Sequence, residues 1–138
     1  IFGKASSEIQ EKIYRFGINL GLAFQLQDDY LDLYPKSIKM GKTVGGDLLN
    51  RKKAIPYLIA LNEANESQKS QIETLINSQD ENRVEKLTVI FEDIEVKEKT
   101  EAMISEYFEL SEQSLSSIEG VDLSPIKLFA KNLLEREQ

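Results

Sequence analysis

The stretch GLAFQLQDDYLD, residues 21–32, joins an apolar helical stripe to three aspartates, and the interpretation of the whole chain starts from it. It lies inside residues 7–34, where apolar side chains such as Leu20 and Phe24 recur at steps of three and four. That period is typical of an amphipathic helix. Pro35 ends the pattern, because a proline cannot continue a helix. We therefore predict one long helix with an acidic C-terminal turn.

The remaining sequence also indicates helices. Residues 35–53 read as a loop, since one proline and three glycines interrupt any period. Five helices are expected after it: from Pro56 to about Ala64, from Asn65 or Ser67 through Ile76, from Asp80 through Ile94, over residues 97–119 with a stop at Gly120, and from Ser124-Pro125 onward. No run has the alternation of a strand, so the predicted fold class is all-α. A length of 138 residues suits a single all-α domain, residues 1–138.

Composition excludes several kinds of chemistry. The 138 residues include no Cys, no His and no Trp. Without Cys there are no disulfides, iron–sulfur clusters or thiol nucleophiles, and without Cys and His a zinc site is implausible. A triad that uses histidine as its base is also excluded. Any catalysis must come from Asp, Glu, Lys, Arg, Tyr or hydroxyl groups.

Charge is distributed unevenly along the chain. The net charge is -7, which argues against nucleic acid as a partner. Residues 1–53 nevertheless hold 9 basic and 6 acidic residues, whereas residues 54–138 hold 8 basic and 18 acidic ones. No stretch approaches the apolar length of a membrane span, and the first residues have no apolar core long enough for a signal peptide. We expect a cytoplasmic protein.

The aspartates are spaced for a divalent cation. On a helix, Asp28 and Asp32 face the same way, and so do Gln25 and Asp29 on the adjoining strip. Like charges at this spacing repel, and a hard cation relieves the repulsion. Mg²⁺ typically takes one or two carboxylates together with waters and substrate phosphates. The alternative is an acidic helix surface that is merely solvated.

A basic segment follows the aspartates. Residues 36–53 contain six cations and one anion, Asp47. Lys42 and Lys52 could supply charge to phosphate oxygens that a metal also holds. The carboxylates and the basic segment that follows them together favour a phosphate-and-metal site over a solvated acidic turn.

These residues resemble the trans-isoprenyl diphosphate synthase family, the polyprenyl synthetases. The match consists of residues 21–32, the run GKTVGGDL at residues 41–48, and residues 52–56. In the family this is the second aspartate-rich motif with its flanking Phe-Gln and the following Gly-Lys loop. The similarity covers roughly residues 1–65. It implies the C-terminal portion of the isoprenoid synthase fold, a helical bundle around a cavity.

The resemblance also implies a reaction, a cofactor and residue roles. The reaction is the condensation of an allylic diphosphate with isopentenyl diphosphate by a Mg²⁺-dependent prenyltransferase, of the polyprenyl, geranylgeranyl or farnesyl diphosphate synthase type. Residue by residue, it assigns metal binding to Asp28, Asp29 and Asp32. It assigns substrate binding to Phe24, Gln25, Lys42 and Lys52, and catalysis to Asp28 and Lys42.

Part of the family pattern is missing. The N-terminal half with the first aspartate-rich motif is absent, so we expect a piece of a longer protein that is inactive alone and forms a homodimer at full length. A non-catalytic regulatory subunit of a heteromeric synthase stays open as an alternative. A terpene cyclase stays open as well, although the second metal motif usual in those enzymes is not found. The last alternative is a plain helical domain whose aspartates are solvated.

Overall fold

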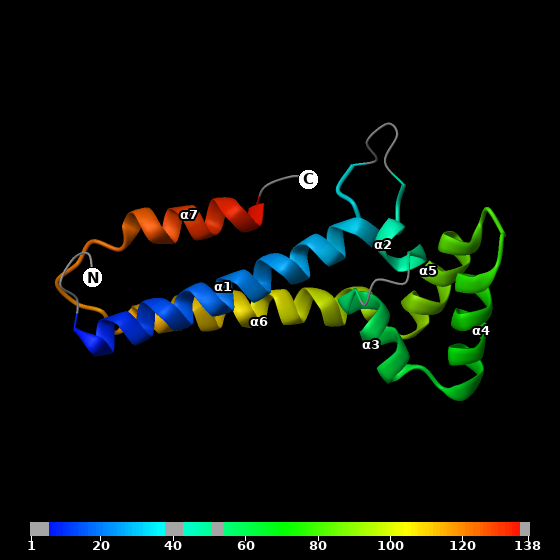
Figure 1. The fold of residues 1–138 in the computed structure, drawn as a ribbon, viewed down its shortest axis with the longest axis horizontal. Coiled ribbons are helices and arrows are strands. Elements are labelled where there is room, and N and C mark those ends of the chain that lie inside the picture. Colours follow the sequence, from blue (N-terminus) through cyan, green and yellow to red (C-terminus); the bar gives the residue numbers. More distant parts are fainter. Residues whose placement is uncertain (1–5, 38–42, 51–53, 136–138) are drawn as a thin grey trace. The chain divides into compact units, whose positions relative to one another are not determined.

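The described part of the chain is entirely helical. The structure is a computed structural model, and it describes residues 6–37, 43–50 and 54–135. Its helices are α1 (Ser7–Leu33), α2 (Gly46–Leu49), α3 (Ile55–Glu63), α4 (Glu66–Asn77), α5 (Arg83–Asp93), α6 (Val96–Ser116) and α7 (Ser124–Glu135) (Figure 1). No strand occurs within these ranges. The all-α prediction is confirmed.

The chain divides into two compact units. One unit combines residues 1–27 with residues 103–137, and the other contains residues 28–102. Helices α1 and α6 each contribute one part to each unit. The three aspartates of the acidic motif all fall in the second unit.

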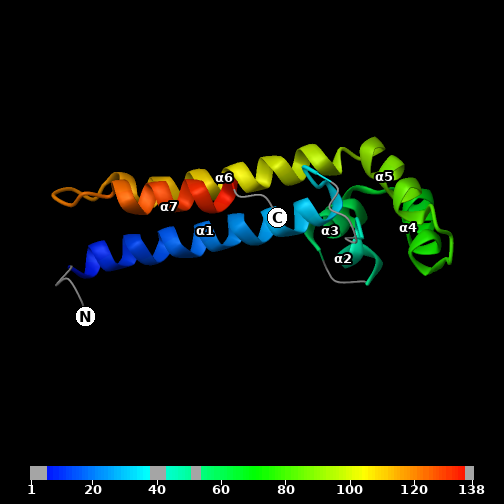
Figure 2. The same cartoon turned by 90° about the horizontal axis from the view of Figure 1, so that it is seen from above.

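The first unit consists of three helices. The first part of α1, the second part of α6 and α7 run side by side in both views (Figures 1 and 2). Their shared core is formed by Phe16, Leu20, Leu115, Ile118, Leu123 and Ala130. At the C-terminal end of α7, the backbone carbonyl of Leu134 accepts a hydrogen bond from the side-chain amide of Gln27 on α1. Burial of the apolar stripe of α1 holds this unit together.

The second unit has its own core. It is built from the end of α1, α2 to α5 and the start of α6, and its buried residues are Leu33, Leu48, Ala60, Ala64, Ile72, Ile76, Leu87, Phe91, Ile94 and Val96. Helices α4 and α5 pack against each other as a pair (Figure 2). Asn65, one of the two predicted caps, is the N-cap of α4 and forms a capping box: Asn65 Oδ1 accepts from Gln68 N at 2.9 Å, and Gln68 Oε1 accepts from Asn65 N at 3.0 Å.

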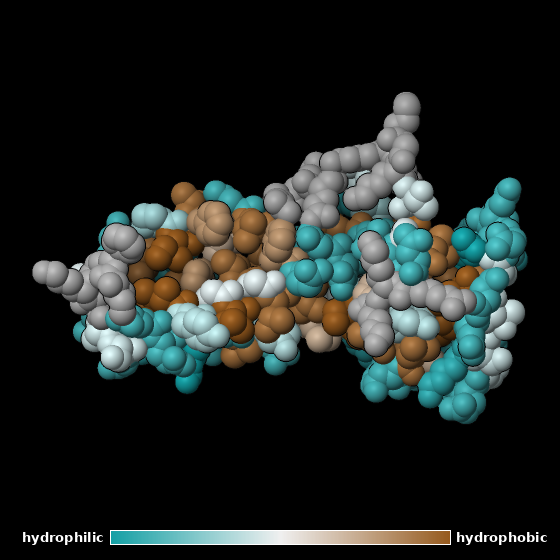
Figure 3. Space-filling model, viewed as in Figure 1, coloured by the Kyte–Doolittle hydropathy of each residue, from teal (hydrophilic) through white to brown (hydrophobic). Residues whose placement is uncertain are grey.

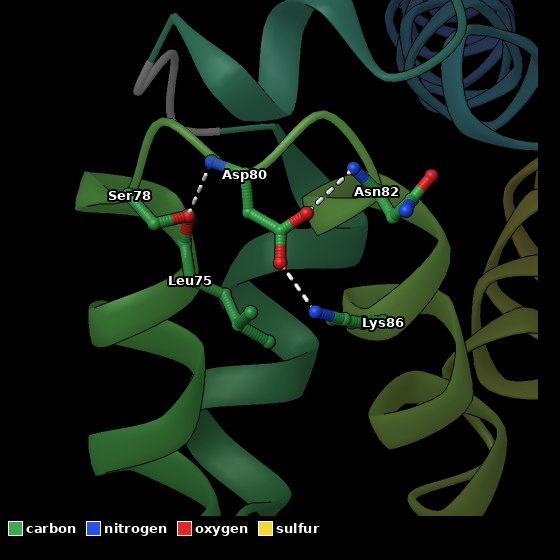
Figure 4. Close-up of polar contacts among 5 residues, drawn as sticks. All are labelled: Leu75, Ser78, Asp80, Asn82 and Lys86. Carbon is green, nitrogen blue, oxygen red and sulfur yellow. Dashed lines mark hydrogen bonds and ion pairs between the residues drawn. The ribbon is translucent and has the colours of Figure 1, made fainter.

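Helix α5 begins later than expected, at Arg83. Asp80, predicted to open it, instead organises the turn that precedes it (Figure 4). Its Oδ1 accepts a hydrogen bond from Asn82 N at 2.8 Å, and its Oδ2 pairs with Lys86. The backbone N–H of Asp80 donates to Ser78 Oγ at 3.3 Å. Asp80 therefore bridges the end of α4 and the first turns of α5.

Two further predictions are corrected. Residues 46–49 form the short helix α2 inside the region predicted to be a loop. Gly120 does not stop α6, which ends at Ser116; it has a φ of 76° in the connection to α7. The helix ends early because Ile118 turns into the core of the first unit, where it is 8% exposed.

One face of α1 is not covered by any other segment that the structure describes. An added Cβ at Gly17 or at Gly21 would meet nothing within 4 Å, so no other described segment packs closely against either glycine. Four large apolar side chains of this helix are exposed: Ile13, Tyr14, Ile18 and Leu22. Figure 3 shows apolar side chains gathered over the region of α1 and α7 in this view. This face of the first unit is apolar and uncovered among the described residues.

Candidate functional site

The three aspartates of the acidic motif lie on the last two turns of α1. Asp28, Asp29 and Asp32 are all half-buried, and the Oδ1 atom of Asp28 is inaccessible to solvent. Burial of a carboxylate costs free energy unless hydrogen bonds or a cation compensate. A merely solvated acidic turn would have exposed side chains, so burial argues against that alternative.

Asp29 is bonded to the start of α3. Its Oδ2 accepts a hydrogen bond from Ile55 N at 3.0 Å. The N-cap residue of α3 is Ala54, which has no side-chain acceptor, and Pro56 has no N–H to offer. Asp29 therefore supplies from another helix the cap that the local sequence lacks.

Asp32 holds the turn before α2 at two points. Its Oδ2 accepts from Asp47 N at 3.1 Å, and its backbone carbonyl accepts from Gly45 N at 2.8 Å. Gly45, the N-cap residue of α2, has a φ of 72° and no side chain that could cap. A Cβ at Gly45 would lie 3.1 Å from Val84 Cγ1, so the turn fits closely against α5. This turn needs glycine both for its conformation and for its packing.

The other residues singled out by the sequence lie on α1, on α2 or outside the described residues. Phe24 and Gln25 lie on α1 within the first unit, where Phe24 is half-buried and Gln25 is exposed. Lys42 and Lys52 lie outside the described residues, so their proposed contacts with phosphate stay predictions. Asp47 is half-buried in the first turn of α2.

The donor chemistry of the motif fits Mg²⁺, but no three-carboxylate cluster is formed. Carboxylate oxygens are hard ligands of the kind that Mg²⁺ prefers. Among residues 6–37, 43–50 and 54–135, however, no group of three acidic side chains is close enough to hold one ion. A site with one or two carboxylates, completed by waters and phosphate oxygens, is therefore the form that these residues fit.

Two tyrosines near the motif were missed by sequence reasoning. Tyr30 donates a hydrogen bond to Glu101 Oε1 at 2.5 Å, and desolvation together with that carboxylate raises its pKa far above the ordinary value. Desolvation, with Glu98 and Glu92 nearby, raises the pKa of Tyr34 to about 12. Both phenols are protonated at neutral pH, so neither is a general base. No local signal could pair Tyr30 with a glutamate so distant in the sequence.

A surface hollow in the same unit contains none of these residues. It has a volume of about 540 Å³, lies between α4 and α5, and is lined mainly by Leu75, Val89, Ile90 and Lys86. Its chemistry is that of a shallow apolar groove, and it offers neither carboxylates nor phosphate-binding cations beyond Lys86, which is paired with Asp80. The acidic motif, rather than this hollow, is the candidate site.

Comparison with known proteins decides the family. The family model for polyprenyl synthetase matches residues 1–94, which include the acidic motif, the glycine turn and α3. The chain belongs to the polyprenyl synthetase family. The match ends at residue 94, directly after α5, so α6 and α7 lie outside it.

Relatives of this polyprenyl synthetase chain agree with that assignment. A short chain isoprenyl diphosphate synthase of Methanothermobacter thermautotrophicus is 30% identical over 99% of this chain and 42% of its own length. The heptaprenyl diphosphate synthase component 2 of Bacillus subtilis is 35% identical over 96% of this chain and 38% of its own. The chain thus spans about two fifths of the length of these curated relatives.

A solved structure agrees as well. The crystal structure of a geranylgeranyl pyrophosphate synthase superposes with a TM-score of 0.80 at 28% identity, over 97% of this chain and 43% of that one. The isoprenoid synthase fold expected from the sequence is thereby confirmed. None of the described helices is long and apolar enough to cross a bilayer.

Proposed function

We propose that this chain is the C-terminal catalytic part of an isoprenyl diphosphate synthase that condenses an allylic diphosphate with isopentenyl diphosphate. The observation that carries the proposal is the half-buried acidic motif of α1, bonded to the starts of α2 and α3, in a member of the polyprenyl synthetase family. A solvated acidic turn would not be built into two neighbouring helices. Product chain length stays open, because the relatives differ in it.

The residues have a consistent division of tasks in this proposal. Asp28, Asp29 and Asp32 form the acidic motif proposed to hold Mg²⁺, which when bound would stabilise negative charge on the leaving diphosphate. Lys42 and Lys52 are proposed to neutralise phosphate oxygens. Phe24 and Gln25 are proposed to line the allylic pocket. Ionisation of the allylic C–O bond builds charge on diphosphate, so cations placed there lower the barrier.

The length of the relatives supports a further part of the proposal. Because the chain spans about two fifths of these synthases, we expect it to lack the first aspartate-rich motif and to be inactive alone. At full length we expect a homodimer. Location in the cytoplasm stays a prediction from the sequence.

Ligand-induced stabilisation tests the site directly. We expect Mg²⁺ with inorganic pyrophosphate to raise the melting temperature of the chain, since a ligand at 100 times its Kd stabilises by about 2.7 kcal/mol. Asp28→Ala should abolish the shift, whereas Asp93→Ala, at an exposed aspartate ending α5, should preserve it. A shift that survives Asp28→Ala would contradict the assignment.

A second function is favoured by one relative. The Bacillus subtilis protein is named as one component of a heptaprenyl diphosphate synthase, so a chain similar to it could act as a subunit of a heteromeric enzyme. A regulatory subunit without chemistry would not need a metal site. Co-purification with a second chain, together with no effect of Mg²⁺ and pyrophosphate on stability, would favour this alternative.

A further inference from the structure

Two of the three aspartates accept hydrogen bonds from backbone N–H groups of later helices. Asp29 Oδ2 and Asp32 Oδ2 each accept from a backbone N–H that belongs to a later helix, at 3.0 and 3.1 Å. These N–H groups sit at the starts of α3 and α2, where a helix has no intrahelical partner to offer. Since the local N-cap residues Ala54 and Gly45 have no acceptor, both helices depend on α1 for their caps.

We propose that Asp29 and Asp32 are positioning residues, which fasten the starts of α3 and α2 to α1 and so fix these two helix starts beside the acidic motif. This inference deepens the proposed function, on which its ligand-binding arm rests. It assigns to two motif residues a task that depends on an oxygen acceptor and not on a negative charge.

The surroundings of Asp32 support an anchoring task. Its backbone carbonyl accepts a hydrogen bond from Gly45 N, and its carboxylate accepts one from Asp47 N. On its other side, the turn at Gly45 packs against the side chains of Val84 and Leu33. A turn fixed at two points and packed on its other side has little freedom to shift. Small displacements of a binding group cost much of its effect, which is why such anchoring matters to a site.

The carboxylates of the described residues also support an anchoring task for Asp29 and Asp32. In the described part of the chain, no three acidic side chains lie within reach of one cation. Mg²⁺ needs only one or two protein carboxylates when phosphate oxygens complete its shell. Two of the three aspartates can therefore serve the backbone without leaving the metal short of ligands.

Asparagine substitutions distinguish anchoring from metal binding. Asn keeps a carbonyl oxygen that can accept the same N–H but loses the charge that a cation requires. The experiment compares Asp32→Asn with Asp32→Ala, and Asp29→Asn with Asp29→Ala, in the full chain. Asp28→Ala serves as the metal-site control, and Asp93→Ala as a control for loss of an exposed carboxylate.

Amide hydrogen exchange in metal-free buffer is the first readout. We expect Asp32→Ala to speed exchange of the Asp47 N–H about tenfold, and Asp29→Ala to speed exchange of the Ile55 N–H by the same factor. That factor corresponds to the loss of a hydrogen bond to a charged group. The Asn variants should restore most of the protection, and Asp28→Ala should leave both amides unchanged. Unaltered exchange in the Ala variants overturns the inference. If an Ala variant does not fold, loss of protection in the matching Asn variant overturns it.

Stabilisation by Mg²⁺ with inorganic pyrophosphate is the second readout. Positioning predicts that Asp32→Asn and Asp29→Asn retain most of the wild-type melting shift, while the Ala variants lose it. An Asn variant that keeps its amide protection but loses the shift overturns the positioning role, because charge would then be the property that matters. A wild-type chain without any shift contradicts the proposed function instead, and the amide data still decide the anchoring.

Discussion

The rings of Tyr30 and Tyr34 lie 5.2 Å apart between centroids, tilted by 43°, yet their hydroxyl groups have different surroundings. That of Tyr30 donates to Glu101. That of Tyr34 is buried and has no hydrogen-bond partner among the described residues. The pair therefore offers a matched test of what a phenol contributes in this core.

Removal of the Tyr34 hydroxyl should stabilise the chain. We expect Tyr34→Phe to raise the free energy of unfolding by about 1 kcal/mol, because a buried polar group without a partner is destabilising. Tyr30→Phe is the control and should lower it by about 1 kcal/mol through loss of the bond to Glu101. Urea denaturation measures both. Destabilisation by Tyr34→Phe would mean that its hydroxyl is satisfied in solution.

Two glycines with positive φ should respond differently to alanine. Gly120 has a φ of 76° and nothing within 4 Å of an added Cβ, so Gly120→Ala should cost only the left-handed backbone penalty, about 1 kcal/mol. Gly45→Ala adds a contact of 3.1 Å with Val84 and should cost about 3 kcal/mol. Thermal unfolding of both variants gives the comparison. Equal losses would contradict the close packing of the turn.

The glycines on the uncovered face of α1 should tolerate alanine. Neither Gly17 nor Gly21 would bring a Cβ within 4 Å of another element, and alanine is the better helix former. Each substitution should raise the free energy of unfolding by about 0.8 kcal/mol. Circular dichroism during thermal unfolding checks this. A loss of stability would show that another surface packs on this face in solution.

The turn before α5 should lose stability in acid. The ion pair with Lys86, followed by the Asn82 backbone N–H, holds the pKa of Asp80 below its usual value of 3.8. A carboxyl whose pKa is lower in the folded state contributes stability above the unfolded value and loses it as pH falls through the folded one. Asp80→Asn should therefore destabilise the chain at neutral pH but have little effect well below pH 3.8.

Urea denaturation at the two pH values measures that difference. Asp93→Asn serves as the control, because Asp93 is an exposed aspartate in the same helix pair. An Asp80→Asn effect that is the same in acid and at neutral pH would contradict the role of the charge. It would assign the effect to the turn alone.

The ends of helices are predicted best where the sequence pattern involves residues close together along the chain. The apolar period of α1 and the choice of Asn65 as a possible cap of α4 depend on residues a few positions apart, and the structure has both. Asp80 was placed in the correct region, but its side chain caps a turn instead of a helix. A propensity for capping does not say which N–H is near, because nearby donors depend on the path of the chain.

The acidic motif could be found from the sequence, but its bonds could not. Their spacing on one helix predicted that Asp28, Asp29 and Asp32 lie near one another. The family resemblance added the prediction that they bind a metal ion. The partners of two of them, Ile55 and Asp47, lie far along the chain and contribute backbone N–H groups, which carry no side-chain signature. The pairing of Tyr30 with Glu101 could not be predicted either, because the two residues lie far apart in the sequence.

The sequence by itself determined the helical class, the long first helix, the family motif and the kinds of chemistry that are excluded, because these follow from residue types and spacing along one helix. Only the tertiary structure decided that Asp29 and Asp32 cap α3 and α2, that Gly45 is packed against Val84, and that Gly17 and Gly21 are uncovered. Those relationships join residues that meet only when distant segments pack, and hydrogen bonds and close contacts depend on that approach rather than on local preference.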